Sequence, residues 1–286
     1  MSKVKKSASQ SEEPKKLRLS ASRCNVYLHC GMEYFYTYHE HLQPKESGAR
    51  PLFVGALVHR LKHQFNIGKL NLEALADYGK VVQKLFPEVV NDQEAISIAS
   101  EALTLFSGFV NEFKDDPLTV VSSETHLELD RGDYILYTRV DELVRTQDEK
   151  LWRGEHKTTA RIDNAYLKGL KRGIQAGIAD IVLSKVMPEK IWGTMYNLLV
   201  KTKVPQYYRS PILTEKNLRP MTESMLKYVH DGITNERFGC SMDCFVWNRE
   251  CKFLPLCKHD SPQIREAFYK YRPDEIPTSE GEEDEV

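Results

Sequence analysis

The sequence of 286 residues predicts an α/β fold in which a mixed central β-sheet is flanked by helices. Three patterns favour this fold class. Residues 134–144 alternate with the period of two that a half-buried strand requires. Residues 92–113 repeat apolar side chains at helical spacing. The expected elements also combine a strand hairpin with a strand–helix–strand crossover, which gives a sheet with both parallel and antiparallel pairs.

The N-terminal part of the chain is expected to be helical. Residues 20–42 and 51–66 are predicted to be helices, and 92–113 is an amphipathic helix that should pack one apolar face against the core. That face carries Ala99, Ala102, Leu103, Phe106, Phe109, Val110 and Phe113.

The central and C-terminal parts alternate between strands and helices. A polar turn at 146–149 separates two of the strands, which we expect to pair as a hairpin. Thr214 is placed to cap the last helix, with Glu215 in its first turn and Leu218, Met221 and Met225 facing inward. The predicted strands are 118–129, 133–145, 150–158, 190–201 and 206–213, with a helix at 163–186.

Two carboxylates and a lysine lie on the predicted hairpin. Glu155 and Lys157 share one face of the second strand because they are two residues apart, whereas His156 points the other way. The hairpin should therefore bring Asp141, Glu155 and Lys157 together. Carboxylates can hold Mg²⁺ or Mn²⁺, and an ammonium group can orient water or stabilise charge on a phosphate. The alternative is a solvated face or a cross-strand ion pair, which such residues usually form.

The six cysteines indicate a metal centre more than disulfides. The N-terminus begins Met-Ser-Lys-Val-Lys-Lys and lacks the apolar stretch of a secretory signal, so we expect a reducing compartment. Cys244, Cys251 and Cys257 cluster near the C-terminus, with Cys240 upstream, at wider spacing than the close pairs of zinc sites. Wide spacing favours an iron–sulfur cluster, which needs a fourth thiolate from elsewhere. A zinc-ribbon structural protein with incidental carboxylates is the alternative.

The segment from Leu19 to Tyr36, LSASRCNVYLHCGMEYFY, resembles the opening of RecB-like nucleases of the PD-(D/E)XK superfamily that carry an iron–sulfur cluster. CRISPR-associated, AddB-nuclease-like and phage exonuclease-like proteins belong to this group. The resemblance implies a restriction-endonuclease-like core whose two ends are clasped by a [4Fe-4S] cluster. The implied ligands are Cys30, Cys244, Cys251 and Cys257, which leaves Cys24 and Cys240 over, with Cys240 a competitor for the place of Cys244.

Further motifs follow in the family's order, and this order is more specific than any single motif. Gly55-Ala56-Leu57-Val58-His59 resembles the helix that presents a histidine to the metal, with Gly55 leaving room for another element. The tyrosine expected four residues after the family's glutamine is replaced by Ala179. Taken alone, a histidine or glutamine on a helix is by default a packed or surface residue. The resemblance implies His59, Asp141 and Glu155 as ligands of Mg²⁺ or Mn²⁺, and Lys157 and Gln175 as further catalytic residues.

The net charge of −1 does not by itself indicate a nucleic-acid-binding protein, but charge is concentrated at the chain ends, basic at the start and acidic at the finish. Lys168, Lys171 and Arg172 precede Gln175 on one predicted helix and either contact phosphates or form a solvated face. The expected organisation is a disordered basic tail at 1–18, a single nuclease domain at 19–272 with a helical insertion at about 66–116 and an iron–sulfur segment at 240–257, and a disordered acidic tail at 273–286.

These patterns predict a metal-dependent DNA nuclease, with exonuclease action on DNA ends or single strands as the favoured form. The alternative is a nucleic-acid-binding or recombination-accessory module that keeps the fold and the cluster but cuts nothing. No apolar run approaches the ~20 residues that cross a bilayer, so we expect a cytoplasmic protein encoded by a cell, plasmid or phage. Digestion polarity, strand preference, exonuclease against endonuclease action and any helicase, recombinase or CRISPR integration partner stay open.

Overall fold

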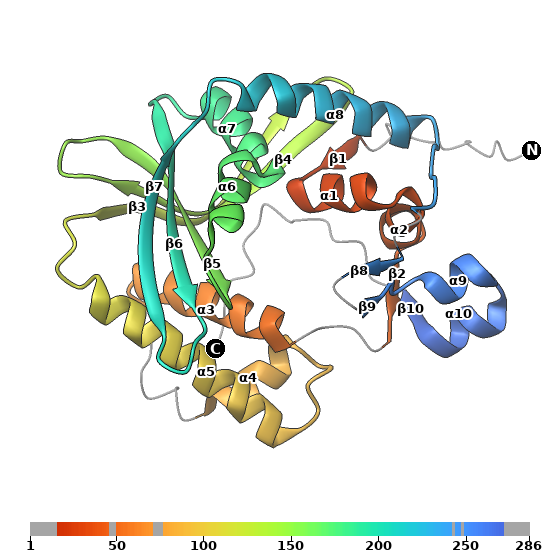
Figure 1. The fold of residues 1–286 in the computed structure, drawn as a ribbon, viewed down its shortest axis with the longest axis horizontal. Helices are drawn as coiled ribbons and strands as arrows, with labels where there is room; N and C mark the ends of the chain where they lie inside the picture. The colour runs from red at the N-terminus through yellow and green to blue at the C-terminus, as the bar shows by residue number, and fades with distance from the viewer. Residues whose placement is uncertain (1–15, 46–49, 71–76, 242–243, 247–248, 272–286) are drawn as a thin grey trace, which may run out of the picture.

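A six-stranded mixed sheet lies at the centre of the protein (Figure 1). A computed structural model describes residues 16–45, 50–70, 77–241, 244–246 and 249–271. The strands are β1 (Leu17–Leu19), β3 (Thr119–Asp130), β4 (Tyr134–Arg145), β5 (Leu151–Thr159), β6 (Ile191–Val200) and β7 (Gln206–Leu213). The β1–β4 and β5–β6 pairs are parallel, whereas β3–β4, β4–β5 and β6–β7 are antiparallel. The predicted fold class and the predicted β4–β5 pairing are confirmed.

One edge of β4 is paired over only part of its length. β3 runs along the opposite edge of β4. On the edge in question, β1 pairs with Tyr134–Leu136 and β5 pairs with Glu142–Arg145. Within the described chain, residues 137–141 have no strand partner on that edge. β4 and β5 therefore form a fork that opens at Asp141.

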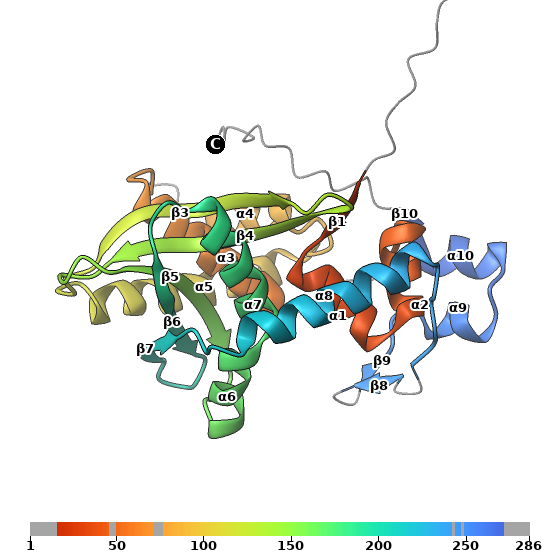
Figure 2. The same ribbon diagram turned by 90° about the horizontal axis from the view of Figure 1, so that it is seen from above.

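Helices cover both faces of the sheet (Figures 1 and 2). On one face α7 (Ile174–Val186) packs on β3, β4 and β6, and is covered by α1 (Ala21–His29) and α8 (Leu218–Thr234). On the other face lie α3 (Arg50–Asn66) and α5 (Asp92–Glu112), with α4 (Tyr78–Leu85) against α5. Each face has its own apolar cluster, one centred on Leu57, Leu61, Ile98 and Leu105, the other on Leu136, Ile178, Val182 and Leu226.

Two helices that were predicted to be continuous are broken. The segment predicted as one helix over 20–42 forms α1, α2 (Gly31–Tyr34) and the π-helix η1 (Phe35–His39). Cys30 separates α1 from α2 because its backbone is extended, with φ −159° and ψ 118°. The segment predicted as one helix over 163–186 is divided at Gly173, which has ψ 144°, into α6 (Asn164–Arg172) and α7. Glycine is a poor helix former, so a break there costs little.

Two further expectations were wrong in detail. The last long helix, α8, begins at Leu218 after Asn217 and not directly after Thr214. Met221 consequently lies 58% exposed on its outer face, while Leu226 and Val229 are buried. The expected N-terminal tail of 1–18 also ends too late, because Leu17 and Arg18 belong to β1. The rest of both expected tails, except Lys16, lies outside the described residues.

A segment near the N-terminus and the C-terminal end of the described chain meet beside the main sheet. β2 (Leu42–Pro44) pairs antiparallel with β10 (Tyr269–Tyr271). Phe253 joins them, since its ring centroid lies 5.3 Å from that of Tyr36 and 5.5 Å from that of Tyr269. The remaining elements of this region are β8 (Phe245–Val246), β9 (Arg249–Glu250), α9 (Leu254–Lys258) and α10 (Pro262–Phe268).

Candidate active site

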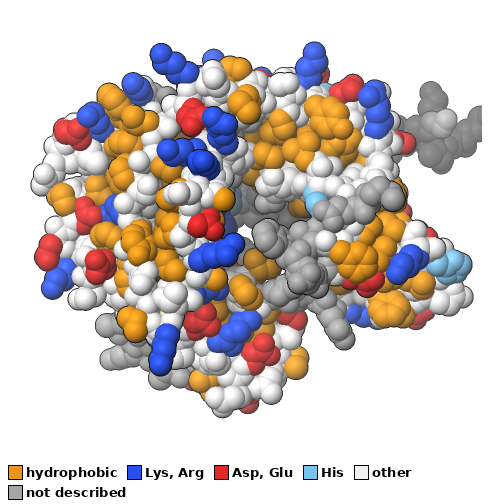
Figure 3. Space-filling view, in the orientation of Figure 1, with side chains coloured by type: hydrophobic (Ala, Val, Ile, Leu, Met, Phe, Trp, Pro, Cys, Tyr) orange, Lys and Arg blue, Asp and Glu red, His pale blue; other side chains and the backbone are white. Residues whose placement is uncertain are grey.

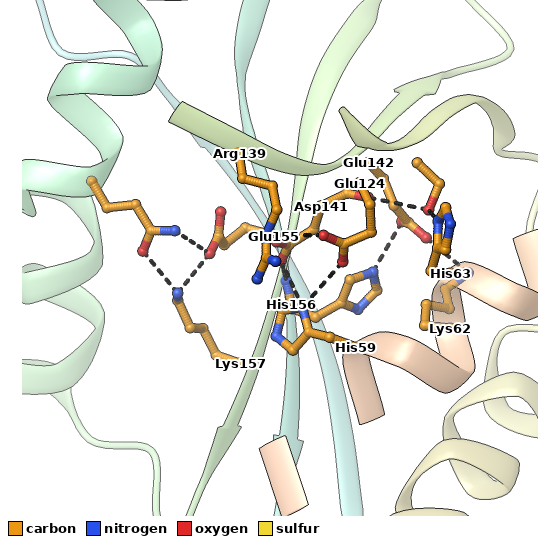
Figure 4. Close-up of polar contacts among 12 residues, drawn as sticks. His59, Lys62, His63, Glu124, Arg139, Asp141, Glu142, Glu155, His156 and Lys157 are labelled. Atoms are coloured by element: carbon orange, nitrogen blue, oxygen red, sulfur yellow. Dashed lines mark hydrogen bonds and ion pairs between the residues drawn. The ribbon is translucent and has the colours of Figure 1, made fainter. Parts of the chain in front are cut away.

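Asp141 lies at the opening of the fork, where it is only 5% exposed (Figure 4). Its Oδ2 accepts a hydrogen bond of 2.8 Å from the backbone N–H of His156 on β5. The same oxygen lies 3.5 Å from Nδ1 of His59 on α3. A Cβ on Gly55 would lie 3.2 Å from the Thr158 hydroxyl, so this glycine lets α3 approach β5 closely, as expected. The carboxylate is thus held by β5 and faced by α3.

Three potential metal ligands converge at this point. One ligand atom each from His59, Glu124 and Asp141 lies within 4.8 Å of the other two. The β3–β4 register places Glu124 opposite Asp141, because the flanking pairs are Ser123 with Glu142 and Thr125 with Val140. Glu124 has φ 51°, which a non-glycine residue rarely adopts outside functional sites and turns.

Glu124 was missed in the sequence, where only the second and third strands supplied candidates. The sequence could have indicated Glu124. If the two strands on either side of the short turn at 131–133 pair as a hairpin, residue 124 lies opposite residue 141. Arg139 accompanies Glu124, with its Nε 3.0 Å from Glu124 Oε2 and a side chain that is 57% exposed.

Glu155, Lys157 and Gln175 form a second group beside the first. Glu155 Oε1 accepts hydrogen bonds from Lys157 Nζ at 2.6 Å and from Gln175 Nε2 at 2.7 Å. Lys157 Nζ also donates to Gln175 Oε1 at 2.8 Å. The chain therefore brings these three predicted residues together, although Glu155 is not in the group of three ligands above. Ala179, where a tyrosine was expected from the family, is fully buried against Val140 and takes no part in the site.

A divalent cation fits this set of donors. Glu155 is 1% exposed, and its Oε2 has no hydrogen-bond partner within the described part of the chain. A buried polar atom without a partner calls for an explanation, and a hard cation that prefers oxygen ligands supplies one. Mg²⁺ or Mn²⁺ is therefore compatible with the oxygen-rich environment made by Glu124, Asp141 and Glu155.

Burial and mutual repulsion set the charges of these groups. Burial, followed by the charge of Glu155, raises the pKa of Asp141 to about 6 against the opposing effect of His59. Burial would also raise the pKa of Glu155, but Arg153 and Lys157 outweigh it and lower the pKa. Glu155 is thus the more readily ionised of the two carboxyls. A cation between them would relieve the repulsion.

A second buried ion cluster lies directly beside the site. Glu142 Oε2 lies 3.1 Å from His156 Nε2, and its Oε1 lies 3.0 Å from Lys62 Nζ and 2.5 Å from Asn66 Nδ2. Burial would raise the pKa of Glu142, but His156 and Lys62 hold it well below its usual range. Lys62 and Asn66 come from the same helix as His59, so this cluster joins α3 to both strands of the fork.

Cys30 lies beside the C-terminal cysteine segment. Its Sγ accepts a hydrogen bond of 3.4 Å from the backbone N–H of Ser241. The backbone N–H of Cys251 donates to the carbonyl oxygen of Cys244 at 2.7 Å. Cys30 therefore lies next to the C-terminal cysteine segment although 211 positions separate it from Ser241, and no disulfide is formed among the six cysteines, all of which are described.

The thiols of this region influence one another. Burial raises the pKa of Cys257 to about 11, and the charges of Cys240, Cys251, Cys30 and Cys244 add to the shift. Cys24 is separate, fully buried in the α1 core, and burial raises its pKa to about 12.

The chain is similar to a nuclease family in sequence pattern and to a solved structure in fold. A family model described as the PD-(D/E)XK nuclease superfamily matches residues 18–258. A solved structure from Eubacterium rectale, described as a "Putative exonuclease", is 12% identical with a TM-score of 0.58, covering 80% of this chain and 86% of that one. At that identity the likeness concerns the fold alone.

A second solved structure, of SSO0001, is 16% identical over 63% of this chain and 85% of that one. Its TM-score of 0.28 is too low to support an argument. No curated protein gives a significant match. Among the helices of the described chain, none has the length and apolar character needed to cross a membrane.

Proposed function

The chain belongs to the PD-(D/E)XK nuclease superfamily, and from this premise we propose that it is a Mg²⁺- or Mn²⁺-dependent DNA nuclease. The observation that carries the proposal is the fork, where Asp141 and Glu155 are buried side by side on diverging strands next to Lys157. The exonuclease form, acting on DNA ends or single strands, is in keeping with the description of the fold neighbour from Eubacterium rectale.

Each residue of the site has a proposed role. His59, Asp141 and Glu155, together with the newly found Glu124, would hold the metal. The metal would supply Lewis acidity and lower the pKa of a bound water. Lys157 would stabilise negative charge on the phosphate, or orient the attacking water, through the Nζ that now contacts Glu155. Gln175 keeps that ammonium group in place through its hydrogen bond of 2.8 Å.

We further propose the RecB-like organisation, with one nuclease domain whose ends are joined by a [4Fe-4S] cluster on Cys30, Cys244, Cys251 and Cys257. The approach of Cys30 to Ser241 and the β2–β10 pairing support it. In this scheme the cluster stabilises the small C-terminal elements, because thiolate–metal bonds can supply folding free energy to a loop-rich segment.

The test is digestion of end-labelled single- and double-stranded DNA by protein purified without oxygen. The expected result is cleavage with Mg²⁺ or Mn²⁺, none with EDTA, and none by Asp141→Asn or Lys157→Ala variants that retain the fold. Binding of DNA without cleavage under any divalent cation would instead support the accessory module. Release of mononucleotides from an end would identify the exonuclease form, whereas cutting of a closed circle would exclude strict dependence on ends.

A further inference from the structure

We propose that the exposed face of helix α6 is a docking surface for the phosphodiester backbone of the DNA strand being cut. This inference rests on the proposed nuclease function for its choice of partner. It adds a binding surface outside the metal site, formed by Lys168 and Lys171.

Both ends of α6 are fixed next to the site. The helix follows β5, which carries Lys157, and it precedes α7, whose second residue is Gln175. Those two side chains bond to each other at 2.8 Å, so α6 leaves the active site and returns to it. Figure 2 shows the helix standing away from the sheet and the other helices. A strand of DNA bound at the metal site would therefore have α6 as a neighbouring element.

Helix α6 packs on one side only. None of its residues is fully buried, but Tyr166, Leu167 and Leu170 are half-buried, whereas Lys168 and Lys171 are exposed. Hydrogen bonds also tether both ends of the helix. Asp163 caps its start by accepting from the N–H of Tyr166 at 2.8 Å, and the Tyr196 hydroxyl donates to the carbonyl oxygen of Leu170 at 3.0 Å. Its outer face is thus free for a partner.

The charge of α6 selects a polyanion as that partner. The helix contains three cations and no acid, NAYLKGLKR, in a chain whose net charge is −1. Lys168 and Lys171 are exposed and form no ion pair or hydrogen bond with any described residue, whereas Arg172 is 3.3 Å from Glu215. The Cβ atoms of residues three apart on a helix, such as Lys168 and Lys171, lie about 5–6 Å from each other. The two lysines could therefore contact neighbouring phosphates of one strand. Figure 3 shows Lys and Arg side chains gathered in this area of the surface.

The test is the salt dependence of DNA binding, measured by anisotropy in Ca²⁺ to avoid cleavage. The double variant Lys168→Gln/Lys171→Gln should weaken binding by about tenfold at moderate salt. It should also reduce the slope of log K against log salt by about 1.4–1.8, since each phosphate contact contributes about 0.7–0.9. Lys168→Arg/Lys171→Arg should restore both values. A matched control, Lys84→Gln/Lys203→Gln, removes the same charge from exposed positions on α4 and after β6 and should leave the slope unchanged.

The outcomes separate this inference from the proposed function. An unchanged slope in the α6 double variant, with parent-like DNA affinity, would overturn the docking surface even if the parent cleaves DNA. A reduced slope in a protein that never cleaves would sustain the surface and reject the nuclease. Failure of the parent protein to bind DNA at all would reject both.

Discussion

Glu142 and His156 form a buried polar contact, with Oε2 and Nε2 3.1 Å apart, and each directly follows a carboxylate of the site, Asp141 or Glu155. The pair spans the fork on the face of the sheet opposite to Glu155 and Lys157. It joins β4 to β5 at the point where the paired register ends, and Lys62 attaches α3 to the same carboxylate at 3.0 Å. The separation of the strands at the site is therefore supported by side-chain contacts on the other face of the sheet.

Loss of the Glu142 charge should destabilise the protein strongly. Glu142→Gln leaves the Lys62 ammonium buried without an anion, and breaking a buried pair in this way costs about 3 kcal/mol. Urea unfolding measures the free energy. The control is Glu189→Gln, which breaks the exposed pair with Arg145 and should cost less than about 1 kcal/mol. An equal decrease in the free energy of unfolding in the two variants would show that the buried cluster stabilises the protein no more than an exposed ion pair does.

Glu124→Gln should impair metal binding while leaving DNA affinity in place. Removing one carboxylate from the group formed with His59 and Asp141 should raise the Mn²⁺ concentration for half-maximal cleavage by about 10- to 100-fold. A metal titration of the initial rate measures this. Glu128→Gln is the matched control on the same strand, because Glu128 pairs with Arg18 and lies outside the group of ligands. A normal metal requirement in Glu124→Gln would remove Glu124 from the site.

Activity should fall as the pH drops through about 6, the value to which burial and then Glu155 raise the pKa of Asp141. The proton on Asp141 competes with the metal, so the metal concentration needed for half-maximal cleavage should rise in acid. Rate against metal concentration at pH 7.5 and pH 5.5 measures the shift. An equal metal requirement at both pH values would contradict the assignment.

Lowering the pH should reduce activity through Asp141, but it should favour folding through the same carboxyl. Because its folded pKa exceeds the ordinary value of 3.8, the folded protein binds more protons between about pH 4 and 6, and Asp141 favours folding as the pH falls. In EDTA at pH 7.5, Asp141→Asn should therefore raise the free energy of unfolding by about 3 kcal/mol, and the gain should shrink as the pH falls from about 6 to 4. A gain that stays constant from pH 7.5 to pH 4.5 would show that the raised pKa is not its cause.

Cys30→Ser should abolish the iron content and broad visible absorption expected of anaerobically purified protein, because it removes one proposed cluster ligand. Cys24→Ala is the matched control, since this buried thiol belongs to the α1 core and should affect stability alone. Iron analysis of Cys240→Ser and Cys244→Ser should identify which of the two is a ligand together with Cys30, Cys251 and Cys257. Full iron in Cys30→Ser would exclude the proposed clasp.

The sequence was sufficient for features that depend on local periodicity. Alternation located β4 and β5 to within a residue or two, and spacing by two placed Glu155 and Lys157 on one face. The motif order also predicted that His59 and Gln175 would lie near them. The strand positions and the shared face of Glu155 and Lys157 follow from backbone geometry, which repeats along each element, whereas His59 and Gln175 were implied by the family resemblance.

Only the tertiary structure decided how separate elements meet. Glu124 joins the site through the register of β3, the fork opens because β1 and β5 share one edge of β4, and Lys62 reaches Glu142 from α3. The break at Gly173 that makes α6 a separate helix, and the exposure of Met221 on α8, likewise became visible only in the structure. Register and packing are set by contacts between residues far apart in the chain, so no local pattern contains them.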